Sequence, residues 1–331
     1  MNKLLERLPE EAKKKLHKTE QPDWEDPMLA TLTKQRLDDH GWIFDRKLDG
    51  ERCIAYKKHG GVRLMSRNGH SINTSYPEVV EALQQQSIEN FIIDGEIVAF
   101  DQKGETKFEL LQPRMGVLAS PGSAAPVYYY VFDILYYDGH DTTRLTQLDR
   151  KWLLENALSY EGALQFVKHR VGGGLEFFKE ACVKGWEGLI AKKGDAPYVH
   201  SRSDLWLKFK CMAEQEFVIG GFTEPQGKRE CFGALLLGYY QGGKLKYAGK
   251  VGTGFDNTTL EKLNEKFSPL ERKSSPFAEE IREKGAHWLE PVLVAQIGFE
   301  EWTDLGKLRQ PRYMGLRPDK DAKDVVKEVP K

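Results

Sequence analysis

The spacing of strand-like segments changes near Cys211, and this change constrains the fold more than any other feature of the sequence. From Gly41 to about Cys211, segments rich in β-branched and aromatic residues alternate with stretches of helical periodicity. The strand candidates are WIFDRKL, ERCIAYKK, GVRLMSRN, FIIDGEIVAF, VYYYVFDILYYD, GLIAKK and LWLKFK. The helical candidates are Tyr76 to Gln86, Lys151 to Leu158 and Glu176 to Lys184. This part therefore predicts a mixed α/β domain, with a loop at residues 120–126.

After Cys211, glycine-bearing strand candidates follow one another, and one helical stretch runs from Thr258 to Lys266. The strand candidates are EFVIGGFT, GALLLGYY, KLKYAGKVGTG and VLVAQIGFEEWT. This pattern is typical of a compact, mostly antiparallel β-barrel. The predicted fold class is α+β. The expected divisions are an N-terminal arm (1–25), a domain of mixed, mainly antiparallel sheets and helices (26–212), a β-barrel (213–322) and a polar tail (323–331).

The chain of 331 residues contains 40% hydrophobic and 30% charged residues, which is ordinary for a globular protein with real cores. No apolar run approaches the roughly 18 residues of a membrane span, and the charged N-terminus does not resemble a secretory signal. The four cysteines form no C-x-x-C pair, so we expect neither a zinc site nor a disulfide framework, and a reducing cytoplasm. The net charge of −1 argues against a purely electrostatic coat for nucleic acid, but it permits a local basic groove.

Lys47 lies in the stretch FDRKLDGERC, between the apolar run from Trp42 to Phe44 and the apolar segment CIAY. Asp45 and Asp49 flank it at two residues on either side, and Arg52 follows five residues later. By itself this pattern fits a surface hairpin with a solvated lysine as well as it fits a reactive amine. The rest of the chain has to distinguish the two.

Several other short segments carry charged groups on or beside strand candidates, where a buried carboxylate is costly without a metal, a hydroxyl or a cation as its partner. Each segment alone is more often a turn or a solvated face. Taken together and in order, they resemble the motifs of the covalent nucleotidyltransferases, and specifically of the ATP-dependent DNA ligases. The matching motifs are KLDGER (47–52), SRNG (66–69), DGE (94–96), VFDIL (131–135), EGLIAK (187–192), WLKFK (206–210) and RPDK (317–320). Within that family the chain is most similar to the ligase module of bacterial ligase D.

The resemblance implies an adenylation domain followed by an OB-fold barrel, and a lysine that attacks the α-phosphate of ATP to form lysyl-AMP. Lys47 occupies the position of that lysine. An ordinary lysine has a pKa near 10.4, so the amine must lose its proton before it can attack. Lys208 and Lys210, which are two residues apart and therefore on one strand face, match the lysines that hold the α-phosphate.

The same resemblance assigns the nucleoside contacts. Phe132 is expected to stack on the base, and Asp45 to accept from the exocyclic amino group of adenine, where many relatives carry a longer Glu. Arg52 and Glu96 match contacts to ribose and phosphate, and Ile190 also belongs to the nucleotide site. The family's Mg²⁺, for which Mn²⁺ would substitute, is assigned to Glu187, with Glu96 as a further ligand.

For the DNA steps, Arg67 matches the arginine that holds the 5′-phosphate of a nick in double-stranded DNA. Arg317 and Lys320 match a barrel-borne pair that grips the β- and γ-phosphates of ATP during the first step only, which implies a barrel that swings. Duplex DNA is expected to contact a confined basic surface. That surface comprises Arg67, the stretch from Arg202 to Lys210, Lys228, Arg229, Lys244 and Lys246. We expect a monomer that is associated with the nucleoid and has no membrane partner. Whether a Ku-like end-joining protein recruits it is left open by the sequence.

Other functions remain as alternatives. An RNA-capping guanylyltransferase shares the K-x-D-G pattern, but the acidic residue at position 45 disfavours guanine. An RNA ligase has the same chemistry. A nick-binding factor without catalysis is a third alternative, although a pure binder has no need of an amine beside metal-binding carboxylates.

Overall fold

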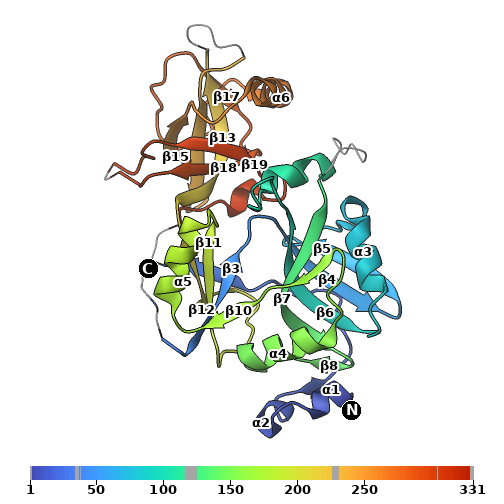
Figure 1. Cartoon of the computed structure of the whole chain (residues 1–331). Coiled ribbons are helices and arrows are strands. Elements are labelled where there is room, and N and C mark those ends of the chain that lie inside the picture. The colour runs from blue at the N-terminus through green and yellow to red at the C-terminus, as the bar shows by residue number, and fades with distance from the viewer. Residues whose placement is uncertain are drawn as a thin grey trace. The chain divides into compact units, whose positions relative to one another are not determined.

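The computed structural model describes residues 2–33, 37, 39–115, 125–225, 231–303 and 305–328. These residues form two compact units, one up to Cys211 and one from Met212 onward. The first unit contains two β-sheets and most of the helices (Figure 1). Within the described part of the chain, no helix is long and apolar enough to cross a membrane.

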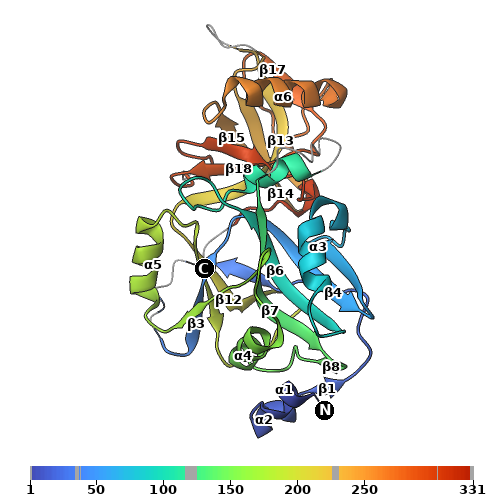
Figure 2. The same ribbon diagram turned by 45° about the vertical axis from the view of Figure 1, so that its right-hand side comes forward.

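The larger sheet of the first unit has the strand order β1-β8-β7-β6-β4-β5, and β9 pairs with β7 in parallel. Its strands are β1 (His17–Lys18), β4 (Glu51–Lys58), β5 (Gly61–Ser66), β6 (Phe91–Ala99), β7 (Val127–Tyr137), β8 (His140–Asp141) and β9 (Leu164–Phe166). Helix α3 (Pro77–Gln84) lies along this sheet and buries Val79 and Leu83 against it (Figure 2). Helix α1 (Lys3–Glu6) adds Leu5 to the same core. The remaining short helices are α2 (Glu10–Lys13), η1 (Asn73–Ser75) and η2 (Phe108–Arg114).

The smaller sheet of the first unit has the strand order β10-β3-β11-β12-β2. Its strands are β2 (Leu29–Leu32), β3 (Trp42–Lys47), β10 (His169–Val171), β11 (Gly188–Lys193) and β12 (Arg202–Lys210). Helix α5 (Gly174–Val183) lies along one face (Figure 1), where Phe44, Leu189 and Leu207 pack around Ala181. Because side chains alternate across a strand, the residues between these apolar positions face the other way.

Helix α4 (Gln147–Ala157) begins four residues before the predicted start at Lys151. Thr146 caps it, since its side chain accepts a hydrogen bond from the backbone N–H of Asp149. Arg150 and Lys151 of its first turn are fully buried, although a helical pattern of charged residues ordinarily indicates a solvated face. The other predicted helices are confirmed to within a few residues.

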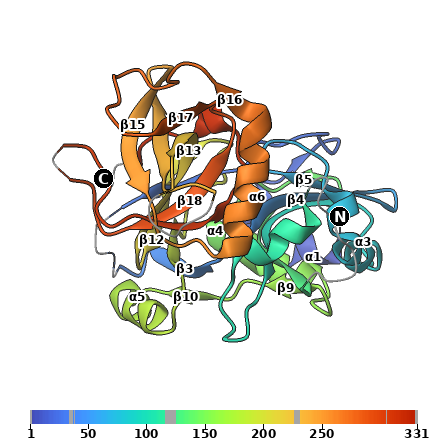
Figure 3. The same ribbon diagram turned by 90° about the horizontal axis from the view of Figure 1, so that it is seen from above.

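The second unit is an antiparallel sheet with one main helix. The strand order is β15-β14-β13-β17-β16, and β18 pairs with both β13 and β19. Its elements are β13 (Ala213–Thr223), β14 (Leu235–Gln241), β15 (Lys244–Val251), α6 (Asn257–Phe267), η4 (Ser268–Leu270), β16 (Glu271–Arg272), β17 (Ala286–Leu289), β18 (Val294–Phe299), β19 (Arg312–Leu316) and η5 (Ala322–Asp324). Helix α6 lies across the strands (Figures 2 and 3) and buries Leu260, Leu263 and Phe267 in their core. The predicted α+β class is confirmed, and the strand pairs among the described residues leave the sheet open rather than closing it into a barrel.

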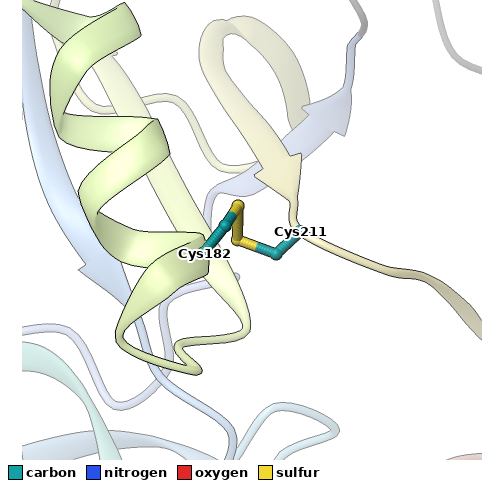
Figure 4. The surroundings of a disulfide bond; sticks show 2 residues. All are labelled: Cys182 and Cys211. Atoms are coloured by element: carbon teal, nitrogen blue, oxygen red, sulfur yellow. A yellow bond between two sulfur atoms is a disulfide. The ribbon is translucent and has the colours of Figure 1, made fainter.

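A disulfide joins Cys182, in the last turn of α5, to Cys211, directly after β12 (Figure 4). The expectation of unpaired cysteines is therefore wrong for these two residues. They are 29 residues apart in sequence, with no local pattern, and the packing of α5 on the sheet brings their Cα atoms to 5.3 Å. Cys53 and Cys231 are free thiols.

Removal of this bond by Cys182→Ser should destabilise the first unit by about 3.5 kcal/mol, because the bond closes a loop of roughly thirty residues in the unfolded chain. Urea unfolding of the variant and the unaltered protein, each with and without a thiol reductant, measures the difference. The matched control is Cys231→Ser, which removes a thiol outside the bond. A difference that persists under reducing conditions would mean that the serine, and not the lost bond, causes it.

Candidate active site

The face of the smaller sheet that points away from α5 gathers four of the charged motif residues, namely Asp45, Lys47, Lys208 and Lys210. In the strand register, Lys47 lies opposite Gly188, which in turn lies opposite Lys210. Two residues further along the strands, Asp45 lies opposite Ile190, which in turn lies opposite Lys208. Three motifs that are far apart in sequence therefore present one continuous surface. Only glycine fits at position 188, because the φ of Gly188 is +153° and an added Cβ would lie 1.8 Å from the carbonyl oxygen of Phe209.

Lys47 ends β3, and its Nζ forms an ion pair with Oε1 of Glu187. Nζ of Lys210 lies 3.9 Å from the same oxygen. The Lys47 side chain is 19% exposed and that of Glu187 is 11% exposed, so the pair is largely shielded but still reachable from solvent. This geometry contradicts the alternative of a freely solvated hairpin lysine and brings the predicted nucleophile to the predicted metal ligand.

Asp45 is buried two residues before Lys47 and is held by two lysines. Its carboxylate oxygens lie 2.9 Å from Nζ of Lys151 and 2.9 Å from Nζ of Lys192. Burial by itself would raise the pKa of Asp45, but the two ammonium groups hold that pKa below its ordinary value. Asp45 is therefore an ionised acceptor at neutral pH.

Arg52 projects from β4 of the larger sheet and forms a bidentate ion pair with Asp94 of β6, at 2.5 and 2.6 Å. The hydroxyl of Tyr198 donates to the same carboxylate at 2.8 Å. Burial opposes the charge on Arg52, but Asp94 raises the pKa of the guanidinium above its ordinary value. Glu96 lies opposite Arg52 in the strand register. The two predicted ribose and phosphate contacts are therefore neighbours.

Phe132 of β7 lies where the two sheets of the first unit meet. Its ring centroid is 4.8 Å from Cζ of Arg52 and 4.4 Å from Nζ of Lys192. The ring of Trp206, on the smaller sheet, packs edge-on against it at 5.9 Å. The predicted stacking residue from one sheet therefore lies beside residues that adjoin Asp45 on the other.

Arg67 directly follows β5. It lines an open hollow of about 480 Å³ in the first unit. The hollow is also lined by Asp23, Trp24, Asp26, Arg63, Met65, Asn68 and Gly69. The lining thus combines an indole and two guanidinium groups with two carboxylates.

The RPDK motif lies in the second unit, where Arg317 forms a bidentate ion pair with Asp319 at 2.8 and 2.9 Å. Nζ of Lys320 lies 3.6 Å from Glu216 of β13. Burial favours the neutral acid, but Arg317 keeps the pKa of Asp319 below its ordinary value. Arg317 and Lys320, the two predicted phosphate-binding residues, are thus close in the chain and ion-paired with acidic residues of the second unit.

The structure adds residues to which the sequence analysis gave no role, namely Lys151, Arg150, Lys192 and Glu216. A signal existed for Lys192, because strand alternation from Gly188 and Ile190 puts it on the same face. No comparable signal existed for Lys151, which lies in a helix of ordinary charged composition. Lys228 and Arg229 of the expected basic surface lie outside the described residues. The described part of the chain contains no cluster of three or more His, Cys, Asp or Glu side chains arranged to hold a metal.

Comparison with known proteins identifies two matching domain families. Residues 27–210 match the ATP dependent DNA ligase domain, and residues 228–320 match the ATP dependent DNA ligase C terminal region. The multifunctional non-homologous end joining protein LigD of Pseudomonas aeruginosa is 36% identical over 95% of this chain and 38% of its own length. The multifunctional non-homologous end joining DNA repair protein LigD of Mycobacterium tuberculosis is 37% identical over 91% of this chain and 40% of its own length.

Among solved structures, a mycobacterial DNA ligase D complexed with ATP and MES matches with a TM-score of 0.67 and 35% identity. The match covers 92% of this chain and 98% of that one. The chain therefore spans about two fifths of the length of the curated relatives it matches, but nearly all of that solved ligase structure.

Replacement of Asp94 by Ala should destabilise the first unit by about 3 kcal/mol, because it leaves the largely buried Arg52 guanidinium without its anion. Asp195→Ala is the matched control, since that carboxylate is 76% exposed and lies 3.9 Å from Lys193. Urea unfolding followed by circular dichroism should place the control within about 0.5 kcal/mol of the unaltered protein. Equal midpoints for the two variants would contradict a structural role for the Arg52–Asp94 pair.

Proposed function

Since the chain belongs to the ATP-dependent DNA ligase family, we propose that it seals nicks between a 5′-phosphate and a 3′-hydroxyl in duplex DNA, by way of lysyl-AMP and adenylated DNA. The observation that carries the proposal is the contact of Lys47 with Glu187, on a sheet face that also presents Lys208 and Lys210. Nucleotidyl transfer through a lysyl intermediate needs an amine, and it is helped by an acid beside that amine and by fixed cations for the phosphate. This face supplies all three.

In the first step, Nζ of Lys47 forms a bond to the α-phosphorus of ATP, and the bond from that phosphorus to the bridging oxygen breaks to release pyrophosphate. The amine attacks only after one proton has left it, and a second proton leaves the nitrogen once the N–P bond has formed; both pass to solvent. Lys208 and Lys210 hold the α-phosphate and offset the negative charge that develops on its oxygens. Phe132 stacks on adenine, Asp45 accepts from the exocyclic amino group, Ile190 contacts the nucleoside, and Arg52 with Glu96 holds the ribose and phosphate.

We assign Mg²⁺ to Glu187, with Glu96 as a further ligand. Hard carboxylate oxygens suit this cation, which in nucleotide sites usually has one or two carboxylates, phosphate oxygens and waters as ligands. When bound, it neutralises phosphate charge. Glu187 would then interact with both the cation and Lys47, with which it forms an ion pair.

In the second step the AMP moves from Lys47 to the 5′-phosphate of the nick, which Arg67 holds. In the third step the 3′-hydroxyl attacks that phosphorus and AMP leaves. Arg317 and Lys320 serve the first step by binding the β- and γ-phosphates, after which the OB-fold domain moves to engage DNA.

The cellular role is part of the same proposal. The similarity to end-joining proteins supports a function in DNA repair or end joining. We further propose a monomer in the cytoplasm, at the nucleoid, with a Ku-like protein as the candidate partner. An RNA ligase would use the same residues. Incubation of the purified protein with labelled ATP and Mg²⁺, followed by sealing assays on nicked DNA and nicked RNA duplexes, distinguishes these substrates.

Lys47→Ala should abolish covalent labelling by α-labelled ATP, because the variant lacks the attacking nitrogen. Lys47→Arg should fail equally, since a guanidinium stays protonated. Lys193→Ala, which removes a half-exposed lysine from the neighbouring strand β11, is the matched control and should label normally. Labelling of Lys47→Ala at the level of the unaltered protein would assign the adenylate to another residue.

The double variant Arg317→Met, Lys320→Met should slow self-adenylation by about a hundredfold, because it removes charge stabilisation from the departing pyrophosphate. Sealing of a nick that is already adenylated should change little, since pyrophosphate takes no part in it. Lys323→Met, an exposed lysine in the same unit, is the control. Equal losses in the two assays would contradict the assignment of this pair to the first step.

A further inference from the structure

Two consecutive residues of α4 bind carboxylates that belong to different sheets. Arg150 forms a bidentate ion pair with Asp133 of β7, at 2.6 and 3.2 Å. Lys151 forms its ion pair with Asp45 of β3 at 2.9 Å. Asp133 directly follows Phe132, so one turn of helix holds both the proposed stacking ring and the proposed base acceptor.

Lys192 of β11, in the smaller sheet, contacts both Asp45 and Phe132. Its ammonium lies 2.9 Å from Asp45, donates to the carbonyl oxygen of Phe132 at 3.3 Å, and lies 4.4 Å from the centroid of the Phe132 ring. It also lies 4.2 Å from the ring of Trp206. Asp45 and Phe132 are therefore linked by two separate bridges, one through α4 and one through Lys192.

All five charged groups of this cluster are almost completely buried. Asp45 and Asp133 contribute two negative charges, against three positive charges from Arg150, Lys151 and Lys192. Burial lowers the pKa of Lys151 to about 8, although Asp45 opposes this shift. Such an arrangement is expensive to desolvate, and hydrophobic residues of the same volume would often be at least as stable. Stability alone therefore does not account for it.

We propose that Lys151 and Lys192 are positioning residues that set the selectivity of the protein for the exocyclic amino group of adenine; this inference rests on the proposed adenylation activity. An ionised carboxylate has about four lone-pair sites. Each lysine forms an ion pair with one oxygen of the carboxylate, at 2.9 Å, and the two together restrain the plane of the carboxylate. Both oxygens keep acceptor capacity for the base. They also hold Asp45 in its ionised form, in which it accepts hydrogen bonds and donates none.

The short side chain at position 45 explains why the carboxylate needs to be held in place by two lysines. Aspartate lacks one methylene of glutamate, so its reach depends on where the strand and its partners hold it. A side chain held from two directions cannot follow a badly placed base, and a base without the amino group leaves the buried acceptor unpaired. The selectivity for adenine then depends on the fixed position of the Asp45 carboxylate as much as on its negative charge.

The test compares covalent labelling by ATP with labelling by purine riboside triphosphate, which lacks only the 6-amino group. The ratio of the two rate constants, measured below saturation, cancels effects on Lys47 because both nucleotides use the same nucleophile. Lys151→Met and Lys192→Met should each lower the preference for ATP by about tenfold or more, the value of one hydrogen bond to a charged group.

Lys57→Met is the matched control. Lys57 is also a buried lysine of the first unit, but its ammonium donates to the carbonyl oxygens of Gln84 and Gln86, at 3.0 and 2.6 Å. It should lose stability and keep the ratio of the unaltered protein. A general loss of packing would instead lower both rates in all three variants without changing the ratio.

An unchanged ratio in folded Lys151→Met or Lys192→Met overturns the proposal. If thermal unfolding finds one of these variants unfolded, the ratio of the other decides. If the unaltered protein takes no label from ATP at all, the proposed function fails, and this result is distinct from the first because it needs no variant.

Discussion

Five buried charged side chains between the two sheets of the first unit constrain how its helix α4 and its strands pack together. Three cations and two carboxylates lie there almost without solvent, and each needs a partner within hydrogen-bonding reach. The partners come from α4, β3, β7 and β11, so none of these elements can shift without leaving an ionised group uncompensated. The geometry of the proposed nucleotide site follows from this requirement, since Asp45 belongs to the cluster and Phe132 directly precedes Asp133.

The second constraint is the two-residue period of the β3–β11–β12 sheet. Apolar residues at alternate positions pack under α5, and the intervening positions present Asp45, Lys47, Ile190, Lys208 and Lys210 on the opposite face. A register slip of one residue in any of the three strands would turn its functional side chains into the apolar core. The same packing that stabilises the sheet therefore aligns the proposed reacting groups.

The sequence predicted the fold class, the longer strands and the main helices, because alternation and helical periodicity are local properties. It missed the short strands, among them β2, β10, β17 and β19, whose few residues carry too little periodicity. It also predicted that Lys47 and Glu187 belong to one site, but only through the resemblance of whole motifs. Lys151 escaped prediction, since burial of a helical lysine depends on which sheet the helix meets. The Cys182–Cys211 pair escaped it for the same reason, because chain separation says nothing about the distance between α5 and the end of β12.

The disulfide also determines how a pull on the second unit reaches the first. Tension on the chain beyond Met212 arrives first at Cys211, one residue after Lys210. There the covalent bond passes much of the load to α5, and the backbone hydrogen bond from Cys211 to the carbonyl oxygen of Glu187 passes a further part to the start of β11. Strand β12, with Lys208 and Lys210, is thereby sheltered from mechanical work done on its neighbour. With the bond reduced, the same force would peel β12 from its end, one hydrogen bond at a time, and its lysines would be the first to leave their register.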